Sequence, residues 1–347
     1  MKGKRTPRKD NAEAKDFQLV VLGELLIDMI PGEVGVPLKE VRSFHPMPGG
    51  APANVAVAAS RLGARSAFIG KVGQDHFGTY LAEVLAGEGV DITGLRFDSQ
   101  ARTTLALVAL PDPDSAEFVF YRNPGADQRL TPSELDHSLL ESGRVFHFGT
   151  VSLTDEPCRG TVWEAVGIAR RAGAIISCDI NYRAALWRSP EQALQEMGRI
   201  LPGVDLLKVN EFEASLLTGK AGLGPDDLSL VELAARELVE RGPRLVVITL
   251  GAAGSYFQLQ DGGGFVPAYP VKSVDTVGCG DAFMAGLLTQ IGTGELWEDL
   301  LEESRIKEAV SFANAVGALT SLKSGAIPAM PSRKTVEEFI SAHGELK

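Results

Sequence analysis

Short apolar runs alternate with amphipathic stretches along most of the chain from residue 18 onward. Several of these runs are near-continuous, which is typical of strands buried on both faces of a sheet. The strand-like runs include Gln18–Gly23, Ser66–Gly70, Arg144–Gly149, Ala174–Asp179, Asp205–Asn210 and Leu245–Leu250, and the helical patterns include Pro52–Leu62, Phe77–Ala86, Thr161–Ala172 and Leu230–Arg241. The alternation predicts an α/β fold, with a doubly wound, mostly parallel sheet and helices on both faces.

Two stretches break this alternation, because Pro37–Pro48 and Thr103–Asn123 are strand-like without an intervening helix. They predict a small β-structure that projects from the main sheet. It is either an ordinary edge hairpin or a lid over a site at the carboxyl ends of the strands, where ligands of open α/β sheets bind. We expect a disordered polar tail over residues 1–16 and one domain over residues 17–347.

The formal net charge of −11 argues against a nucleic-acid partner, because nucleic-acid binders are usually basic. It does not exclude ATP, since a few local donors and a metal ion can bind a polyanion on an acidic protein. No apolar run reaches the roughly 18 residues that span a bilayer, and the polar first 16 residues lack the apolar core of a secretory signal. The three scattered cysteines favour free thiols in a reducing cytosol. For the first 16 residues, the remnant of an organelle-targeting segment stays open as an alternative to a disordered tail.

The segment Asp275–Gly286 combines alternating glycines with an aspartate at a predicted helix start. Backbone N–H groups at a helix N-terminus form an anion site, and glycine lets a phosphate approach closely. Asp281 falls in the first turn, where a carboxylate can act as a base toward a hydroxyl. Phosphoryl transfer needs both features, donors for the migrating charge and a group that takes the proton. The alternative is a glycine turn with an aspartate N-cap.

The stretch Thr249–Gly254 is a loop of small residues that directly follows a predicted apolar strand. Such a loop suits the phosphates of a nucleotide, although many strand-to-helix turns look alike. The chain has no G-x-x-x-x-G-K-[ST] and no G-x-G-x-x-G sequence. The fingerprints of Walker-type P-loops and of dinucleotide-binding folds are therefore absent.

Gly49 and Gly50 lead into a predicted helix with Pro52 near its first position. Asn54 lies on the first turn of that helix, and its amide can donate to and accept from sugar hydroxyls. Asp28 follows the first strand in an apolar context, where a carboxylate can accept two hydroxyl protons. The alternatives are a simple helix start and a surface aspartate.

Asn210 and Glu213 stand three residues apart at the end of an apolar strand and the start of a helix. This spacing lets both side chains face one ligand. Hard oxygen ligands of this type suit Mg²⁺ that is held through water. A solvated acidic turn is the alternative.

Together these four features resemble the ribokinase-like (PfkB) family of sugar kinases, over most of the chain from about Leu19 to Ser332. The segment Asp275–Asp281 is similar to the family's D-T-x-G-A-G-D signature, and Pro48–Asn54 to its substrate-side glycine pair and asparagine. Two such motifs in order form a highly specific signal. Within the family, Phe120–Asp127 resembles the F-Y-R-N-P-S-A-D stretch of fructokinases, and Asp179–Arg183 matches D-x-N-x-R.

The resemblance implies ATP-dependent phosphorylation of a sugar hydroxyl, most closely of fructose to fructose 6-phosphate. Asp281 is the implied general base, and the amides of Gly278, Cys279 and Gly280 are the implied anion hole. The implied sugar-binding residues are Asp28, Gly49, Gly50, Asn54, Arg122, Asp179 and Arg183.

The resemblance also implies ATP with Mg²⁺, and K⁺ bound through loop carbonyls as in many members of the family. The implied nucleotide-binding residues are Lys208, Asn210, Thr249, Gly251, Gly254 and Asn314. The implied metal-binding residues are Glu213 for Mg²⁺ and Asp275, Val277, Thr320, Lys323 and Gly325 for K⁺. The implied partners are the sugar and ATP, with a homodimer through the β-lid and no nucleic acid or membrane, in the cytoplasm or an organelle stroma.

Cys279 departs from the family signature, in which alanine is usual at this position. Its backbone N–H is unchanged and its side chain is only slightly larger, so we expect activity to survive. A thiol at a helix N-terminus can also have a lowered pKa, which would make Cys279 redox-sensitive.

Other functions stay open beside a fructose kinase. Within the family they are 2-keto-3-deoxygluconate kinase and ribokinase. From other classes they are a catalytically silent regulatory or assembly protein, which an intact Asp281 disfavours, and a nucleotide-dependent dehydrogenase, which the missing G-x-G-x-x-G disfavours.

Overall fold

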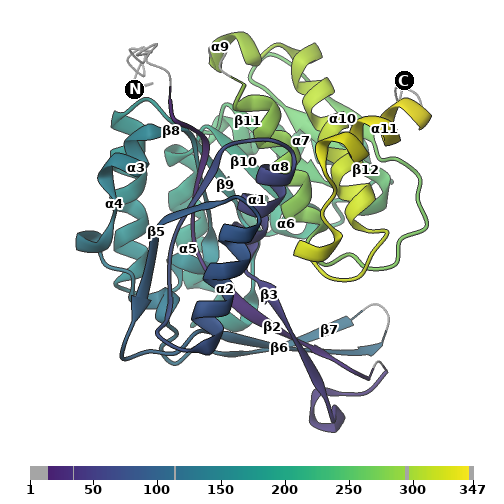
Figure 1. The fold of residues 1–347 in the computed structure, drawn as a ribbon. Coiled ribbons are helices and arrows are strands. Elements are labelled where there is room, and N and C mark those ends of the chain that lie inside the picture. Colours follow the sequence, from purple (N-terminus) through teal and green to yellow (C-terminus); the bar gives the residue numbers. More distant parts are fainter. Residues whose placement is uncertain (1–14, 34, 113–114, 294–296, 344–347) are drawn as a thin grey trace.

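The computed structural model describes residues 15–33, 35–112, 115–293 and 297–343. Among these residues, nine strands form one large sheet in the order β13-β12-β11-β10-β9-β8-β1-β4-β5 (Figure 1). Their bounds are β1 Phe17–Leu22, β4 Ser66–Gly73, β5 Asp91–Asp98, β8 Gly143–Gly149, β9 Ile175–Asp179, β10 Leu206–Asn210, β11 Leu245–Thr249, β12 Gly254–Gln258 and β13 Gly263–Pro267. The six strand-like runs of the sequence correspond to β1, β4 and β8 to β11, so the predicted strands are confirmed.

The large sheet is parallel except at one edge, where β12 and β13 pair antiparallel. The chain leaves β1 toward β4 on one side of the sheet, and β8 pairs with β1 on the other side. The strand order therefore reverses between β1 and β8. Ligands of doubly wound sheets bind outside the carboxyl ends of the strands at such a switch point, so the fold predicts a site beyond Leu22 and Gly149.

Helices cover both faces of the large sheet and give it two apolar cores. One core contains α1 Ala51–Arg61, α2 His76–Gly87, α8 Cys279–Ile291, α9 Trp297–Leu300, α10 Glu303–Thr320 and α11 Arg333–His343. The other contains α3 His137–Ser142, α4 Cys158–Arg171, α5 Pro190–Ile200, α6 Glu211–Thr218 and α7 Leu228–Glu240. Because successive side chains of a strand point to opposite faces, Leu19 and Val21 belong to the first core, and Val20 and Leu22 to the second.

A small four-stranded sheet projects from the body of the molecule in Figure 1, in the order β3-β2-β6-β7. Its strands are β2 Leu26–Pro31, β3 Phe44–Gly49, β6 Leu105–Asp112 and β7 Ser115–Tyr121. The predicted small β-structure is thus present, with two corrections. The strand β2 was not predicted, and the first part of Pro37–Pro48 forms a 3₁₀ turn over Leu38–Glu40 rather than a strand. Most of the predicted tail, residues 1–14, lies outside the described residues.

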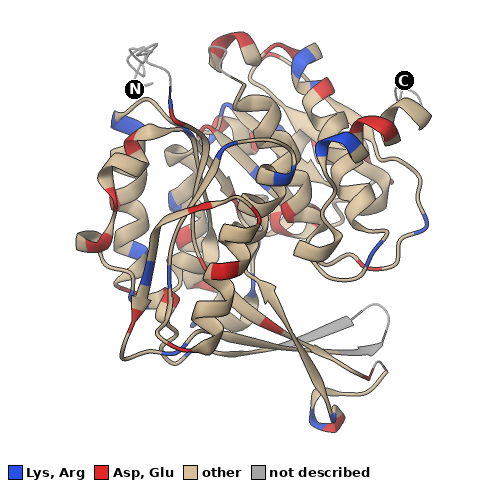
Figure 2. Ribbon diagram, in the orientation of Figure 1, with Lys and Arg blue, Asp and Glu red and all other residues tan. Residues whose placement is uncertain are grey.

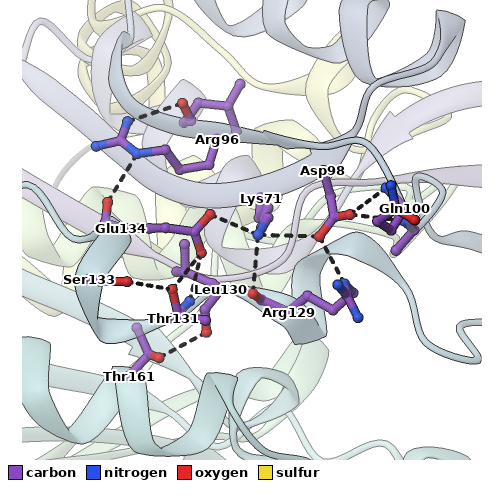
Figure 3. A network of polar contacts seen from close by, with 12 residues as sticks. Lys71, Arg96, Asp98, Gln100, Arg129, Leu130, Thr131, Ser133, Glu134 and Thr161 are labelled. Carbon is purple, nitrogen blue, oxygen red and sulfur yellow. Dashed lines mark hydrogen bonds and ion pairs between the residues drawn. The ribbon is translucent and has the colours of Figure 1, made fainter.

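A network of ion pairs centred on buried Lys71 and Asp98 lies at the end of β5, from which the chain leaves for the small sheet (Figure 3). The ammonium of Lys71 lies 3.2 Å from Asp98 and 2.8 Å from Glu134. The Nε of Arg129 donates to the same Asp98 oxygen at 2.9 Å. Lys71 and Asp98 are both less than a tenth exposed, so solvent screens this network less than a surface pair.

Acidic and basic residues are interspersed among the helices in Figure 2. None of the helices in the described part of the chain is long and apolar enough to cross a membrane. The predicted absence of nucleic-acid and membrane partners is not tested by these observations and stays a prediction.

Candidate active site

The N-terminus of α8 is shaped by Gly278, which takes a left-handed conformation with φ 76°. A Cβ on this residue would lie 2.7 Å from the Cβ of Ala326, so only glycine fits here. The helix begins at Cys279, and Asp281 falls in its first turn, as the sequence predicts.

Asp281 contacts a side chain from the segment that contains the glycine pair Gly49–Gly50. The Nδ2 of Asn54, on α1, donates to its Oδ2 at 2.8 Å. Burial raises the pKa of Asp281 to about 6, against the opposing effects of the Asn54 hydrogen bond, Lys208 and Arg183. The site therefore holds a carboxylate that is ionised near neutral pH yet basic enough to accept a proton.

The first-turn amides of α8 differ in their partners. The Cys279 amide donates to the Thr276 carbonyl at 3.2 Å, and the Ala282 amide donates to the Gly278 carbonyl at 2.8 Å. Within the described residues, the Gly280 amide has no acceptor, as expected for a helix start. The Gly278 amide likewise has no acceptor within the described residues, so Gly278 and Gly280 both keep a donor for a ligand, and the roles of all three predicted anion-hole amides stay predictions.

Asp28 lies on β2 of the small sheet, not directly after the first strand as its place in the sequence suggested. A Cβ on Gly49 would lie 2.0 Å from its Oδ2, so this glycine makes room for the carboxylate. Burial and then the charge of Asp281 raise the pKa of Asp28 to about 7, whereas Arg183 lowers it. Arg183 also lowers the pKa of Asp281, so Asp28, Asp281 and Arg183 lie close enough for their charges to act on one another.

Asp179, at the end of β9, forms a buried ion pair with Lys208 on β10. The Lys208 ammonium lies 2.9 Å from the Asp179 carboxylate, and both side chains are less than a tenth exposed. A Cβ on Gly280 would lie 3.1 Å from the Lys208 Nζ. A buried cation therefore stands beside the start of α8, where a migrating phosphoryl charge would be stabilised.

Asn210 and Glu213 form a reciprocal capping box at the start of α6. The Glu213 amide donates to Asn210 Oδ1 at 2.8 Å, and the Asn210 amide donates to Glu213 Oε2 at 2.9 Å. Glu213 Oε1 accepts the Tyr182 amide at 2.7 Å. Glu213 is 2% exposed, so the alternative of a solvated acidic turn is wrong.

The predicted phosphate loop begins beside this capping box, because Thr249 on β11 pairs with Asn210 on β10. Gly251 and Gly254 both have positive φ, 56° and 134°. Asn314 lies on α10, where its amide accepts from Ser255 and donates to two backbone carbonyls of the β13 end. These bonds give Asn314 a structural role, and its contact with adenine stays a prediction.

The two loops of the predicted K⁺ site lie side by side. One Asp275 oxygen accepts from the Gly325 amide at 2.9 Å, and the other accepts from the Val277 amide at 2.9 Å. The amide of Lys323 donates to the Thr320 carbonyl at 3.4 Å. The Asp275 amide donates to the Ser321 carbonyl at 3.2 Å and so links the two groups, and the carbonyl ligation of K⁺ by the five residues stays a prediction.

Arg122 does not extend from the edge of the small sheet as the sequence suggested. It is 6% exposed, and its Nη2 lies 2.6 Å from Asp127. Its Nη1 donates to Thr154 at 2.8 Å, and its Nη2 also donates to the Val151 carbonyl at 3.1 Å. The guanidinium is thus engaged by protein groups, which indicates a structural role and leaves a contact with the sugar as a prediction.

The hypothesis that Cys279 has a lowered pKa is wrong. Burial, Asp275 and Asp281 raise the pKa of its thiol to about 12. Burial is the main cause of this rise and the two carboxylates add to it, so the reactive thiolate is scarce at neutral pH.

We expect Cys279→Ala to keep kcat within about threefold of the wild-type value, because alanine fits where cysteine fits and the backbone amide is unchanged. Steady-state assays at pH 7.5 measure this. Iodoacetamide should inactivate the wild type slowly, since its thiol is protonated. A tenfold loss of kcat in Cys279→Ala would contradict the interpretation of Cys279 as an alanine substitute.

Sequence reasoning missed Glu24 and Asp127 as residues near the site. Glu24 is 3% exposed and lies two residues after the end of β1, and Asp127 is 5% exposed. The sequence signal for Glu24 was a single acidic residue between two apolar runs at the switch point of the sheet. Burial of a carboxyl group there costs free energy unless the group is hydrogen-bonded, so a buried acid at this place indicates a structural or functional role.

Comparisons with known proteins give a consistent result. Residues 16–333 match the sequence model of one protein family, described as pfkB family carbohydrate kinase. A probable fructokinase-7 from Arabidopsis thaliana is 45% identical over 324 residues, which cover 93% of this chain and 92% of that protein.

Solved structures show the same likeness. Fructokinase from Xylella fastidiosa with bound ATP superposes with a TM-score of 0.83 at 32% identity, covering 94% of this chain and 98% of that one. A double-mutant fructokinase from Vibrio cholerae O395 with fructose, ADP and a potassium ion bound has a TM-score of 0.81 at 31% identity, covering 94% and 99%.

Proposed function

This chain belongs to the pfkB family of carbohydrate kinases, and we propose that it transfers the terminal phosphoryl group of ATP to fructose, giving fructose 6-phosphate. The observation that carries the proposal is the pairing of Asp281 at the start of α8 with Asn54 from α1, beside Asp28 from the small sheet. This pairing places a base and sugar-binding groups next to a helix N-terminus that suits phosphate. The names of the relatives and the ligands of the solved structures support the choice of fructose and ATP.

The residues divide the reaction between them. Asp281 takes the proton of the sugar hydroxyl as the hydroxyl oxygen bonds to the terminal phosphorus and the bond to ADP breaks. The Gly280 amide and the Lys208 ammonium stabilise the charge on the phosphoryl oxygens. Asp28 and Asn54 hold the sugar, and the glycines at 49 and 50 leave room for the Asp28 carboxylate and the Glu24 carbonyl beside them.

Glu213 fits a water-mediated role toward Mg²⁺. The described residues contain no cluster of three or more His, Cys, Asp or Glu side chains that could hold a metal ion by themselves. Each Glu213 carboxylate oxygen accepts one backbone amide and keeps lone-pair capacity for a water. When bound with ATP, Mg²⁺ neutralises phosphate charge, while Glu213 and Asn210 position its water shell.

We propose that the small sheet closes over bound sugar as a lid. Asp28 is carried on one of its strands, so movement of this sheet moves a sugar-binding group. Closure would exclude water and prevent ATP hydrolysis without an acceptor. Val119 and Tyr121, exposed on β7, support the further proposal of a homodimer through this sheet. We place the enzyme in the cytoplasm or an organelle stroma.

We expect fructose to give the highest kcat/KM in an ADP-release assay with fructose, ribose, glucose and 2-keto-3-deoxygluconate. The advantage should be about tenfold or more, because a site built around particular hydroxyls leaves its polar groups unpaired with the wrong sugar. An assay with ATP alone is the control for uncoupled hydrolysis. A preference for ribose or 2-keto-3-deoxygluconate would favour the corresponding alternative kinase, and no turnover with any sugar would favour a silent family member.

A further inference from the structure

The connections between the two sheets converge on one buried place. The chain passes from β1 to β2 through Glu24, and from β3 to α1 through Gly50 and Ala51. It passes from β5 to β6 through Thr104, and from β7 to the 3₁₀ helix η2 (Ala126–Arg129) through Arg122. Polar side chains from these connections contact one another or act electrostatically on one another, so this place is the root of the small sheet.

Glu24 holds the turn that carries the sugar-binding glycines. Its Oε1 accepts the Ala51 amide at 3.1 Å, at the first residue of α1. Its carbonyl oxygen would lie 2.4 Å from a Cβ on Gly50, so the two backbones touch. Within the described residues, its Oε2 is buried and has no hydrogen-bond partner. The carboxyl group therefore links the β1–β2 connection to the turn that precedes Asn54.

Two other connections are joined by Asp127. Its Oδ1 accepts the Thr104 hydroxyl at 2.6 Å, and its Oδ2 accepts the Arg122 Nε at 2.7 Å. The charges of Asp127 and Arg122 both act on Glu24, and Cys158 from α4 interacts with the same groups. If Glu24 were ionised, this enclosed group would hold two negative charges against one positive charge.

We propose that Glu24 is a positioning residue which acts as an uncharged acid, holding the Gly49–Gly50 turn and the root of the small sheet in the geometry that binds the sugar. The role at the sugar rests on the proposed function. Within the described residues, Glu24 contacts neither Asp281 nor the amides at the start of α8, so it acts through the turn rather than on the reacting atoms.

Electrostatics agree with this geometry. Burial raises the pKa of Glu24 from 4.5 to about 8, and the charge of Asp127 adds to the rise. Hydrogen bonds from the backbone amides of Glu24 and Ala51, and the charge of Arg122, oppose it. Since the folded-state pKa lies above the ordinary value, the uncharged group's contribution to stability is complete at low pH. That contribution falls as the pH rises from the ordinary value and is lost on passing through about 8.

The test compares wild type, Glu24→Gln, Glu24→Ala and the control Glu83→Gln, which changes an exposed glutamate on α2. Glutamine keeps an acceptor for the Ala51 amide and cannot ionise, whereas alanine leaves that amide unpaired. Two readouts are measured from pH 6 to 9: KM and kcat with fructose, and the midpoint of thermal unfolding, which requires no catalysis.

We expect Glu24→Ala to raise KM for fructose by roughly tenfold, with KM for ATP and kcat within about threefold, because one buried amide loses its acceptor. Glu24→Gln should restore the wild-type KM at pH 6.5. Its KM should also lack the alkaline rise that the wild type and Glu83→Gln show on passing through about pH 8, and its unfolding midpoint should lack their decline between pH 6 and about 8.

The inference is overturned if Glu24→Ala leaves KM for fructose unchanged within twofold, or if Glu24→Gln keeps the wild-type alkaline changes. If Glu24→Ala does not fold, the pH profiles of Glu24→Gln still decide the question. Wild type without activity on fructose would be a failure of the proposed function, and the unfolding midpoints would then test Glu24 by themselves.

Discussion

Asp281→Asn is expected to lower kcat by roughly 10²–10⁴-fold, which is the usual contribution of a positioned general base. Asparagine has nearly the same shape and can still contact Asn54, but it cannot take the proton of the sugar hydroxyl. The backbone amides at the start of α8 and the Lys208 ammonium remain in place. The affinity for ATP and the thermal unfolding midpoint should therefore stay close to those of the wild type.

The pH profile separates a base from a residue that only binds. The pKa of Asp281 is raised to about 6, so the wild-type kcat/KM should fall as the pH drops below this value and the carboxylate is protonated. The residual activity of Asp281→Asn should lack this acid limb and keep only that of Asp28, whose pKa falls when the Asp281 charge is removed. Asp261→Asn, which changes an exposed aspartate, is the matched control. Turnover within threefold of the wild type in Asp281→Asn would remove Asp281 from the role of base.

The strands of the main sheet could be predicted because their amino-acid composition is strongly apolar. Residues Ser66–Gly73 of β4 are all buried, and a fully buried strand reads as an apolar run. The strand β2 was missed for the same reason, since Leu25, Leu26 and Ile27 follow β1 closely and read as its continuation. Only the antiparallel pairing with β3 shows that the chain has already left the large sheet.

The residues of the candidate site could be predicted from the sequence, but the contacts between them could not. Asn54 and Asp281 were both expected at helix starts, yet their hydrogen bond joins residues 227 positions apart. Local patterns carry no information on such a separation, so only the family resemblance placed the two residues in one site. For Glu213 the local spacing is itself ambiguous, because the same three-residue separation from Asn210 suits a helix capping box and a pair of metal ligands. Only the burial of Glu213 in the fold distinguishes it from an acidic residue in a solvated turn.

Arg122→Ala is expected to lower the free energy of unfolding by about 3–5 kcal/mol, because removing one partner of a buried pair leaves the other charge uncompensated. The remaining charge is Asp127, whose side chain is 3% exposed and, within the described residues, keeps only the hydrogen bond from the Thr104 hydroxyl. The sequence suggested a contact with the sugar, for which loss of activity would be the main effect. The structure favours loss of stability, which urea denaturation at pH 7 measures.

A matched control and a second variant make this prediction specific. Arg188→Ala removes an arginine that is 79% exposed and paired with Asp155 in the same part of the fold. It should cost less than about 1 kcal/mol, as is usual for surface pairs. The double variant Arg122→Met with Asp127→Asn removes both charges while keeping an acceptor for Thr104, and should recover at least about half of the lost free energy. Arg122→Ala with unchanged stability and a tenfold higher KM for fructose would show instead that the guanidinium contacts the sugar.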